Sequence, residues 1–427
     1  MNNNVFNMAM IGSGGYAGYL IGCIAELPDV CRVAAVITRN PASEAAQKYK
    51  VNGISIYGGV DEFIQHVSPA DCPAVIVSTS IESHFDFTKK LIDYGFHVLL
   101  EKPPVSTIQD MDRLIELQRT SGQWITVNFQ FLFNSVTQEL KRRLCAGEFG
   151  KIKSVKSKAL WPRPESYFTR SHWSGCLQVN NLWVLDGTIG NPLAHLLAEV
   201  LYLASEKPGM AKPVSVQAEL YHVNDIESED TSCLRVITGN GVPVFYCATL
   251  CSKETHPVCC EIQTEKAQIR LTDFCTMEIV WQDGRIEKRE TPYSDGRPSR
   301  MEMLRSVVCD LSENKKPLIT AEECRAYMLA WNGAFESAGI PPAVPAEFIS
   351  CENGVRSIQD AEKIFSDAYE QQRLFSEIEI PWSRAGVQID LSGYDFFPSV
   401  HSSFMAHNAH EKGISVMEDS LTGTVIK

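Results

Sequence analysis

The chain has 427 residues, of which 44% are hydrophobic and 21% are charged, enough apolar side chains for two or three globular domains. Its 39 Lys and Arg residues against 52 Asp and Glu residues leave a formal net charge of −13. Such a surface repels phosphate backbones and anionic lipid, so nucleic acid and membranes are not expected partners. Any site for an anion must be built locally, from backbone N–H groups or a few basic side chains.

Composition also predicts the compartment. No run approaches the ~20 apolar residues that a membrane-spanning helix needs. Met1 to Val5 lack the basic segment that opens a secretory signal. The 14 cysteines are irregularly spaced, which favours reduced thiols over a disulfide framework. We therefore expect a cytoplasmic protein.

Apolar runs and helical patterns alternate through the first 125 residues, joined by short connections. The predicted strands cover 5–11, 32–38, 74–78 and 97–100, and the predicted helices cover 16–27, 41–48, 83–94 and 108–121. This alternation is typical of a parallel, doubly wound sheet with helices on both faces. We expect a Rossmann dinucleotide-binding domain over residues 1–126.

The pattern then changes to strands separated by turn signals. The predicted strands cover 152–159, 214–221, 231–238, 242–250, 258–264, 267–271 and 277–282, and helical patterns cover 135–146, 192–203, 300–313, 321–337 and 355–375. Strands joined by hairpins predict a largely antiparallel sheet. Residues 127–385 are thus expected to form an α+β domain for substrate binding and oligomerisation, followed by a tail over 386–427.

A glycine-rich turn lies between the first predicted strand and the first predicted helix. There, Gly12 allows a tight turn, Gly14 lets backbone approach a pyrophosphate, and the small Ala17 lets helix pack on strand. A glycine cluster alone also fits a plain turn, but its strand-to-helix context favours a dinucleotide. The expected cofactor contacts are Gly12, Ser13, Gly14, Gly15, Tyr16 and Ala17.

The second predicted strand ends in Thr38, Arg39 and Asn40. An acidic residue usually holds the ribose 2′-hydroxyl of NAD at this position, and none is present. Thr38 and Asn40 offer neutral hydrogen bonds, whereas Arg39 suits a 2′-phosphate unless it points to solvent. The cofactor is therefore NADP or NAD, with NADP favoured.

The sequence Glu101-Lys102-Pro103 ends the predicted half-sheet, about 90 residues after the glycine turn. With the segment 147–152, this pair of motifs resembles the Gfo/Idh/MocA oxidoreductases (glucose-fructose oxidoreductase, inositol dehydrogenase and relatives) over roughly residues 5 to 385. The resemblance implies a catalytic role for Lys102. The further cofactor contacts that go with it are Ser78, Thr79, His84, Glu101, Lys102 and Gln130.

The residue type at position 102 supports that role independently. Lys102 follows a parallel strand at its carboxyl end, where ligands of open α/β sheets bind. An ammonium there can hydrogen-bond a substrate hydroxyl and stabilise the alkoxide that forms as hydride leaves carbon. The alternative is a surface Lys paired with Glu101.

A second family motif has an Asp and a His four residues apart at the start of a helix. Here His195 has Asn191 four residues before it, and Asp186 nine before it. Either a longer loop lets Asp186 reach the site, or Asn191 contacts the substrate without being able to take a proton. His195 is the expected general base, with an ordinary pKa near ~6.5; the alternative is a core or capping His.

Aromatic and basic residues gather in the segment 161–175. Aromatic faces stack on pyranose rings and Arg binds hydroxyls or carboxylates, although loop aromatics packed on the sheet would look alike. Leu132 stands where relatives often carry an Arg, so recognition of an acidic substrate group is not expected there. The expected substrate contacts are Lys102, Tyr167, Arg170, His172, Trp173, Asp186, Asn191 and His195.

No metal is predicted. The spacing of the Cys and His residues in the segment 247–260 matches no zinc ribbon, and Cys in a strand serves as a small hydrophobe.

The expected function is NAD(P)-dependent hydride transfer between nicotinamide and a secondary hydroxyl of a sugar or cyclitol. By family analogy, a broad exposed sheet face would make the protein a homodimer or tetramer. The alternative is a regulator of the same superfamily that binds NAD(P) and sugar without catalysis.

Overall fold

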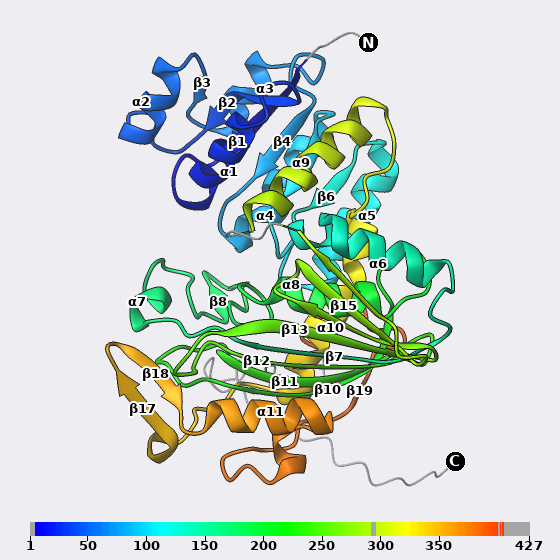
Figure 1. Cartoon of the computed structure of the whole chain (residues 1–427). Helices are drawn as coiled ribbons and strands as arrows, with labels where there is room; N and C mark the ends of the chain where they lie inside the picture. The colour runs from blue at the N-terminus through cyan, green and yellow to red at the C-terminus, as the bar shows by residue number, and fades with distance from the viewer. Residues whose placement is uncertain (1–4, 292–295, 400–401, 403, 405–427) are drawn as a thin grey trace, which may run out of the picture.

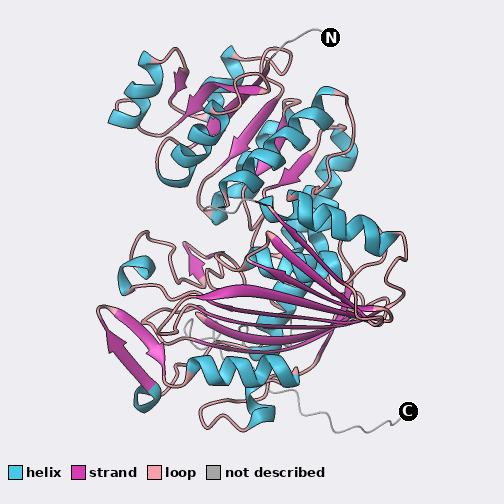
Figure 2. Cartoon of the chain, in the orientation of Figure 1, coloured by secondary structure: helices cyan, strands magenta, loops and turns pink. Residues whose placement is uncertain are grey.

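The computed structural model describes residues 5–291, 296–399, 402 and 404. A parallel sheet wrapped by helices forms the N-terminal half, and one large sheet dominates the C-terminal half (Figures 1 and 2). Among the described residues, no helix is long and apolar enough to cross a membrane.

The N-terminal sheet has six parallel strands in the order β3-β2-β1-β4-β5-β6. This order confirms the predicted doubly wound Rossmann topology, in which the chain runs outward from β1 in both directions. The strands are β1 (Phe6–Ile11), β2 (Cys31–Ile37), β3 (Ser55–Tyr57), β4 (Ala74–Val77), β5 (His97–Leu100) and β6 (Ile125–Val127). All four residues of β4 are buried, as expected for a strand covered on both faces.

Helices cover both faces of this sheet: α1 (Gly15–Ala25), α2 (Glu44–Val51), α3 (Val60–His66), α4 (His84–Asp93) and α5 (Ile108–Ser121). The prediction that Pro41 opens α2 is wrong. Ser43 caps the helix instead, because its hydroxyl accepts the N–H of Ala46. Strand β3 and helix α3 were not predicted, since each is shorter than the pattern needed to recognise it.

The C-terminal sheet has nine strands in the order β16-β15-β14-β13-β7-β12-β11-β10-β19. Neighbouring strands pair antiparallel except β7 with β12, so the sheet is largely antiparallel, as predicted. The strands are β7 (Ile152–Leu160), β10 (Pro213–Tyr221), β11 (Thr231–Thr238), β12 (Pro243–Thr249), β13 (His256–Thr264), β14 (Ala267–Thr272), β15 (Thr276–Trp281), β16 (Ile286–Glu290) and β19 (Ile389–Asp390).

The other elements of this half are short hairpins and helices. The hairpins are β8 (Gln178–Val179) with β9 (Leu182–Trp183), and β17 (Ile349–Glu352) with β18 (Val355–Ile358). The helices are α6 (Ser135–Cys145), α7 (Glu165–Phe168), α8 (Ala194–Leu203), α9 (Arg297–Ser312), α10 (Ala321–Ala338) and α11 (Ala361–Gln371), with short 3-10 turns η2 (Gln130–Phe133), η3 (Ala346–Phe348) and η4 (Phe375–Ile378). A further 3-10 turn, η1 (Ile81–Ser83), precedes α4 in the N-terminal half.

The predicted helix over 355–375 is only partly correct, because 355–358 form strand β18 and α11 starts at Ala361. The apolar spacing of Val355 and Ile358 fits a helix, but the preceding Asn353-Gly354 has positive φ at both positions (52° and 73°). That conformation is typical of a two-residue hairpin turn, which reverses the chain before a helix can begin.

The described part of the predicted tail over 386–427 packs against the C-terminal half. Strand β19 pairs with the edge strand β10, and the side chain of Phe397 is fully buried. Phe397 also packs edge-on against Trp183 of β9, with the ring centroids 5.1 Å apart. Residues 405–427 lie outside the described part of the chain.

The outer face of the large sheet is covered by helix α11 over β7 and β12, and it is exposed over β14–β16, where Arg270, Val280 and Ile286 lie. Helix α11 lies across it: the Tyr369 hydroxyl is 3.3 Å from Cys259 of β13, and Lys156 of β7 lies 4.0 Å from the Tyr369 ring centroid. Beyond α11 the face carries ion pairs such as Lys288–Glu278. The homo-oligomer stays a prediction.

Candidate active site

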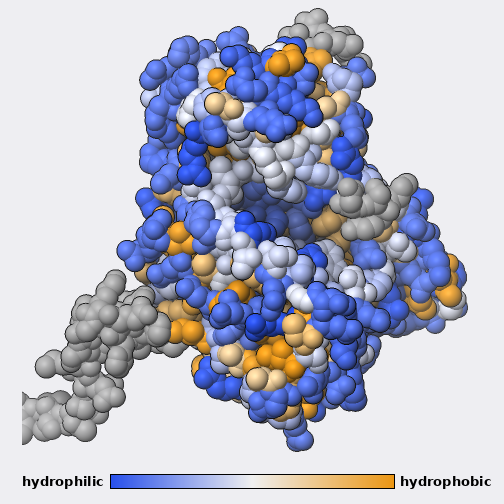
Figure 3. All heavy atoms as spheres, turned by 90° about the vertical axis from the view of Figure 1, so that its left-hand side faces the viewer, coloured by the Kyte–Doolittle hydropathy of each residue, from blue (hydrophilic) through white to orange (hydrophobic). Residues whose placement is uncertain are grey.

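A cavity of about 710 Å³ lies between the two halves of the molecule. From the side it is seen as a deep hollow (Figure 3). Its N-terminal wall is formed by the start of α1 and the carboxyl ends of β4 and β5, where ligands of open α/β sheets bind. Its C-terminal wall comes from η2, the segment after β7, the start of α8 and Arg300 of α9.

The glycine turn has the geometry of a diphosphate cradle. Gly12 has a φ of +118°, and a Cβ there would lie 2.8 Å from both Ala17 Cβ and the Ser78 carbonyl oxygen, so only glycine fits. A Cβ on Gly14 would meet nothing within 4 Å. Gly14 is the N-cap of α1 and no described side chain caps it, so the first N–H groups of the helix are available to an anion.

The predicted ribose-binding residues lie at the end of β2, beside this turn. The Ser13 and Thr38 hydroxyls are 3.1 Å apart, which ties the glycine turn to β2. Arg39 and Asn40 are exposed and lie outside the cavity wall. Arg39 therefore has room to meet a group bound at the rim of the turn.

Ser78 and Thr79 line the cavity as predicted for cofactor contacts, but His84 does not. The His84 ring is buried, with Nδ1 3.0 Å from the Pro103 carbonyl oxygen and Nε2 3.1 Å from that of Thr79. His84 therefore joins the loops that follow β4 and β5 from behind the site.

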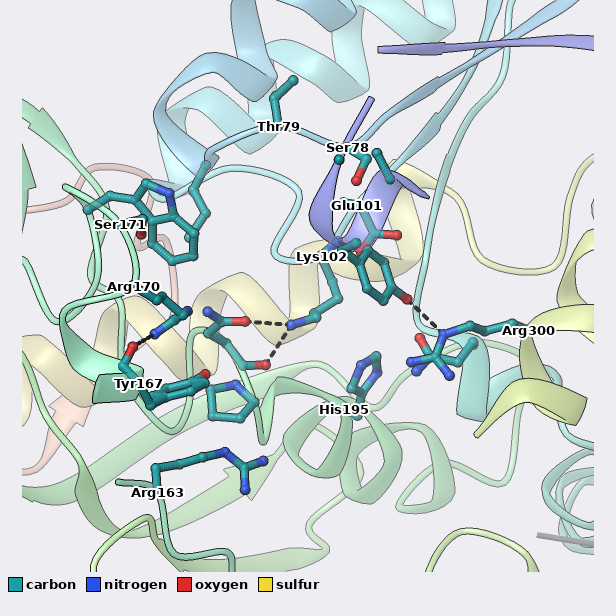
Figure 4. Close-up of a pocket in the computed structure, with 18 of the residues that line it drawn as sticks. Ser78, Thr79, Glu101, Lys102, Arg163, Tyr167, Arg170, Ser171, His195 and Arg300 are labelled. Atoms are coloured by element: carbon teal, nitrogen blue, oxygen red, sulfur yellow. Dashed lines mark hydrogen bonds between the residues drawn. The ribbon is translucent and has the colours of Figure 1, made fainter. Parts of the chain in front are cut away.

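Lys102 points into the centre of the cavity (Figure 4). Its Nζ donates to the backbone oxygen and to Oδ1 of Asn191, at 2.8 Å each. Burial lowers the pKa of the Lys102 ammonium, while Glu101 and Asp186 oppose that shift. The alternative of a surface Lys paired with Glu101 is therefore wrong.

Glu101 is buried behind Lys102 and is held in place from two sides. One carboxylate oxygen accepts a hydrogen bond from Asn128 Nδ2, and the other accepts the backbone N–H of Lys102 at 3.3 Å. Burial raises the pKa of Glu101, and the adjacent Lys102 ammonium opposes this. The Glu101 carboxylate thus holds the backbone N–H of Lys102 and stabilises the positive charge of its ammonium.

Of the two residues left open by the sequence, Asn191 lines the cavity and Asp186 lies behind it; contact of either residue with substrate stays a prediction. Asn191 contacts Lys102 directly, and its Nδ2 donates to Asp186 Oδ1 at 2.8 Å. Asp186 also accepts the N–H of Gly175 at 2.8 Å and lies 3.7 Å from Arg170. Asp186 does not line the cavity and acts through Asn191.

The loop that carries Asn191 is fixed by a residue that sequence reasoning missed. Glu229 is fully buried, and its carboxylate accepts the Ile189 N–H at 2.9 Å and the Thr188 hydroxyl. The Tyr327 hydroxyl donates to the Ile189 carbonyl oxygen at 2.8 Å. No motif marks Glu229, because only the fold brings it beside this loop.

His195 reaches the cavity from the first turn of α8 and is 7% exposed. Its ring packs edge-on against Phe129 and Phe131, and its Nδ1 is buried without a partner among the described residues. Burial and the nearby Lys102 and Arg300 charges lower its pKa well below the ordinary value. The expected pKa near ~6.5 is therefore wrong, because His195 stays neutral in this environment.

Two further residues line the cavity, of which Gln130 was predicted from the sequence and Arg300 was not. Gln130 is 1% exposed, and its Oε1 is buried without a partner among the described residues. Arg300, which no motif indicated, donates from Nε to the Tyr16 hydroxyl at 2.8 Å (Figure 4). It comes from a helix more than 100 residues after the last predicted site segment, so only the fold could reveal it.

The aromatic and basic segment is divided between the cavity and the surface. Arg170 inserts between Tyr167 and Trp173, with its guanidinium 3.7 Å and 4.9 Å from the two ring centroids. All three line the cavity, as do Trp161 and Arg163, which were not among the predicted contacts. His172 does not: its side chain is 63% exposed and lies 3.4 Å from Glu82.

Among the residues that the structure describes, no three His, Cys, Asp or Glu side chains are grouped so as to hold a metal ion. Cys247 and Cys260 are buried in β12 and β13, where they pack as small apolar side chains.

Residues 6–129 match the family model described as "Oxidoreductase family, NAD-binding Rossmann fold". The fold and the glycine turn therefore define the class of oxidoreductases with an NAD-binding Rossmann fold. Within that class, the matching model is that of the Gfo/Idh/MocA family, which agrees with the resemblance seen in the sequence over this part of the chain.

Curated relatives are distant and match in part. An uncharacterized oxidoreductase, YhhX, from Escherichia coli (strain K12) is 28% identical over 161 residues, which cover 38% of this chain and 46% of the relative. Inositol 2-dehydrogenase 2 from Saccharopolyspora erythraea is 25% identical over 244 residues, which cover 56% of this chain and 65% of the relative. The chain thus matches less than two thirds of the length of either relative.

Solved structures show the same fold over a larger part of the chain. The WlbA dehydrogenase from Bordetella pertussis, in complex with NADH and UDP-GlcNAcA, has a TM-score of 0.64 at 20% identity and covers 78% of this chain and 97% of its own. A levoglucosan dehydrogenase in complex with NADH and levoglucosan has a TM-score of 0.67 at 16% identity, covering 78% and 97%. At these identities the likeness concerns the fold alone.

Proposed function

We propose that this protein transfers hydride between a nicotinamide cofactor and a secondary hydroxyl of a sugar or cyclitol. The observation that carries the proposal is the meeting in one cavity of Lys102, from the wall that carries the glycine turn of α1, and His195, from the opposite wall. The NAD-binding family model supports the cofactor class, and the relative named inositol 2-dehydrogenase 2 supports the substrate class.

Residues of both cavity walls fit a dinucleotide. The uncapped N-terminus of α1 at Gly14 suits the diphosphate, and the orphaned Oε1 of Gln130 suits an amide N–H such as that of the nicotinamide carboxamide. At the end of β2, Arg39 is exposed where an acidic residue would favour NAD. We therefore propose that the site accepts NADP(H) as well as NAD(H).

The bound cofactor supplies the hydride acceptor or donor at its nicotinamide ring. Lys102 handles the proton: its amine accepts the hydroxyl proton during oxidation, and its ammonium returns it during reduction. Because its pKa is lowered towards neutral pH, Lys102 can exchange between amine and ammonium more readily there. Asn191 fixes the direction of Nζ through its two hydrogen bonds.

His195 has a different part in this scheme from the one that the sequence predicted. Since its ring is neutral and buried, it offers a hydrogen bond to the reacting hydroxyl and does not serve as the main proton store. Its two aromatic neighbours, Phe129 and Phe131, hold the ring and keep water from that side.

The test is a screen of sugars and inositols with NAD and with NADP, following the absorbance of the reduced cofactor. The proposal predicts turnover of at least one polyol. Binding of either cofactor without turnover of any polyol would instead favour the non-catalytic regulator, and absence of cofactor binding would contradict both.

A further inference from the structure

The substrate side of the cavity is basic, although the chain as a whole is acidic at −13. Four basic side chains line the cavity: Lys102, Arg163, Arg170 and Arg300. Glu101 is the acidic residue among the described lining residues. A positive wall in an acidic protein needs a reason, because each half-buried cation costs desolvation energy unless it is compensated.

Three of the four basic groups have partners in the site. Lys102 donates to Asn191 and is next to Glu101. Arg170 lies 3.7 Å from the Asp186 carboxylate. Arg300 donates to the Tyr16 hydroxyl.

Arg163 differs from them. Within the described part of the chain it has no carboxylate within ion-pair distance; its neighbours are the Pro162 carbonyl oxygen at 3.3 Å from Nη1 and the Tyr167 side chain. Its guanidinium lies 5.5 Å from the Trp161 ring centroid and 5.4 Å from that of Tyr167. The cation is thus held against two aromatic rings and lacks an anion.

The backbone on either side of Arg163 is anchored. The N–H groups of Trp161 and Arg163 donate to the carbonyl oxygens of Thr249 and Leu250 at 2.9 Å, which continues the β7–β12 pairing past the end of the strand. On the other side, the Glu165 N–H donates to Gly354 in the β17–β18 turn at 2.8 Å. Arg163 therefore projects into the cavity from a fixed position (Figure 4).

We propose that the substrate is an anionic sugar or cyclitol, whose carboxylate or phosphate is bound by Arg163 while its reacting hydroxyl lies at Lys102 and His195. The planar guanidinium matches both oxyanions with paired hydrogen bonds, and stacking on Trp161 and Tyr167 pre-organises it. This inference rests on the proposed function. Leu132, which stands where relatives often carry an Arg, is buried and supplies no charge. In this proposal the guanidinium comes from another segment, at Arg163.

The test compares matched substrates with the cofactor-loaded protein. The panel pairs glucose, galactose and myo-inositol with glucuronate, galacturonate, glucose 6-phosphate and inositol 1-phosphate. We expect at least a tenfold higher kcat/KM for one anionic member than for its neutral parent. The arm that shows the preference identifies the oxyanion as carboxylate or phosphate.

Arg163→Gln should remove that preference, because kcat/KM should fall at least tenfold more on the anionic member than on the neutral one. Arg163→Lys should retain part of it, because the charge stays but the fork is lost. The matched control is Arg285→Gln, which alters an exposed Arg paired with Asp283 in the β15–β16 hairpin and should change neither rate.

Failure of this inference is distinguishable from failure of the proposed function. Turnover of neutral sugars with no anionic preference would overturn the inference and leave hydride transfer intact. If no member turns over, the affinity of the protein for each member of the panel is measured by calorimetry. Tighter binding of an anionic member than of its neutral parent, lost in Arg163→Gln, supports the anion-binding role of Arg163. Equal binding of both classes, or no binding of the anionic members, overturns it.

Discussion

The Lys102 ammonium donates two hydrogen bonds to Asn191, at 2.8 Å to the backbone oxygen and at 2.8 Å to Oδ1. The two residues are 89 positions apart in the chain. They belong to opposite walls of the cavity, so this contact joins the Rossmann half to the C-terminal half inside the cavity. A neutral amide at this position orients Nζ without adding a negative charge beside it.

Changing Asn191 to Asp should therefore shift the pH dependence of oxidation. A carboxylate in hydrogen-bond contact favours the ammonium and raises the pKa of Lys102. Since oxidation needs the free amine, the rising limb of the kcat/KM profile should move by about one unit to higher pH. Asn191→Ala serves as the comparison, and a limb that stays in place in Asn191→Asp would contradict proton transfer by Lys102.

Alanine at Gly14 should weaken the binding of cofactor while leaving the fold intact. Its added Cβ meets nothing in the protein but occupies the space in front of α1 where the diphosphate is expected. We expect at least a tenfold increase in the Kd of NAD or NADP, measured by fluorescence titration, with an unchanged Tm. Gly59→Ala is the matched control, because Gly59 also caps a helix, α3, without a neighbour within 4 Å of its Cβ position.

Glu199 should make the protein less stable as pH rises. It is 1% exposed on α8, and burial raises its pKa to about 8 from the ordinary 4.5. A raised carboxyl pKa means that the unfolded state releases the proton first, so stability falls as pH rises from about 4.5 to about 8. Glu199→Gln should match the wild type near pH 4.5 and exceed it by about 3 kcal/mol at pH 7, measured by urea unfolding. Parallel stability curves for the two proteins would refute this.

Phe397 should stabilise the protein, whereas its neighbour Phe396 should not. Phe397 is fully buried against Trp183, and the Gln109 side chain bonds both its N–H (3.0 Å) and its carbonyl oxygen (2.8 Å). Phe397→Ala should cost about 3 to 5 kcal/mol in the free energy of unfolding. Phe396 is 59% exposed, and Phe396→Ala should cost less than about 0.5 kcal/mol. Equal losses would mean that the segment is not packed as described.

The Rossmann half could be predicted from the sequence because its signals are local. The turn at Gly12 and Gly14 lies between a strand and a helix, and Lys102 directly follows a buried strand. Local patterns of this kind fix both the elements and the edge of the sheet at which ligands bind.

The C-terminal half was less predictable because its part of the site is assembled by long-range packing. Whether Asn191 or Asp186 reaches Lys102 depends on how Glu229 holds the intervening loop. The neutral state of His195 depends on its burial beside Phe129 and Phe131, which no residue spacing reveals. Arg300 enters the cavity from a helix that has no motif of its own.

The most direct test of the central claim is the effect of Lys102→Met on hydride transfer, measured together with cofactor affinity. The unbranched side chain keeps much of the lysine shape and loses the amine. With the best substrate of the screen, we predict a fall in kcat of at least about 10³-fold while the Kd of the cofactor changes less than threefold. Lys89→Met, at an exposed Lys paired with Asp93, should leave both values unchanged. Turnover by Lys102→Met within tenfold of the wild type would contradict the account.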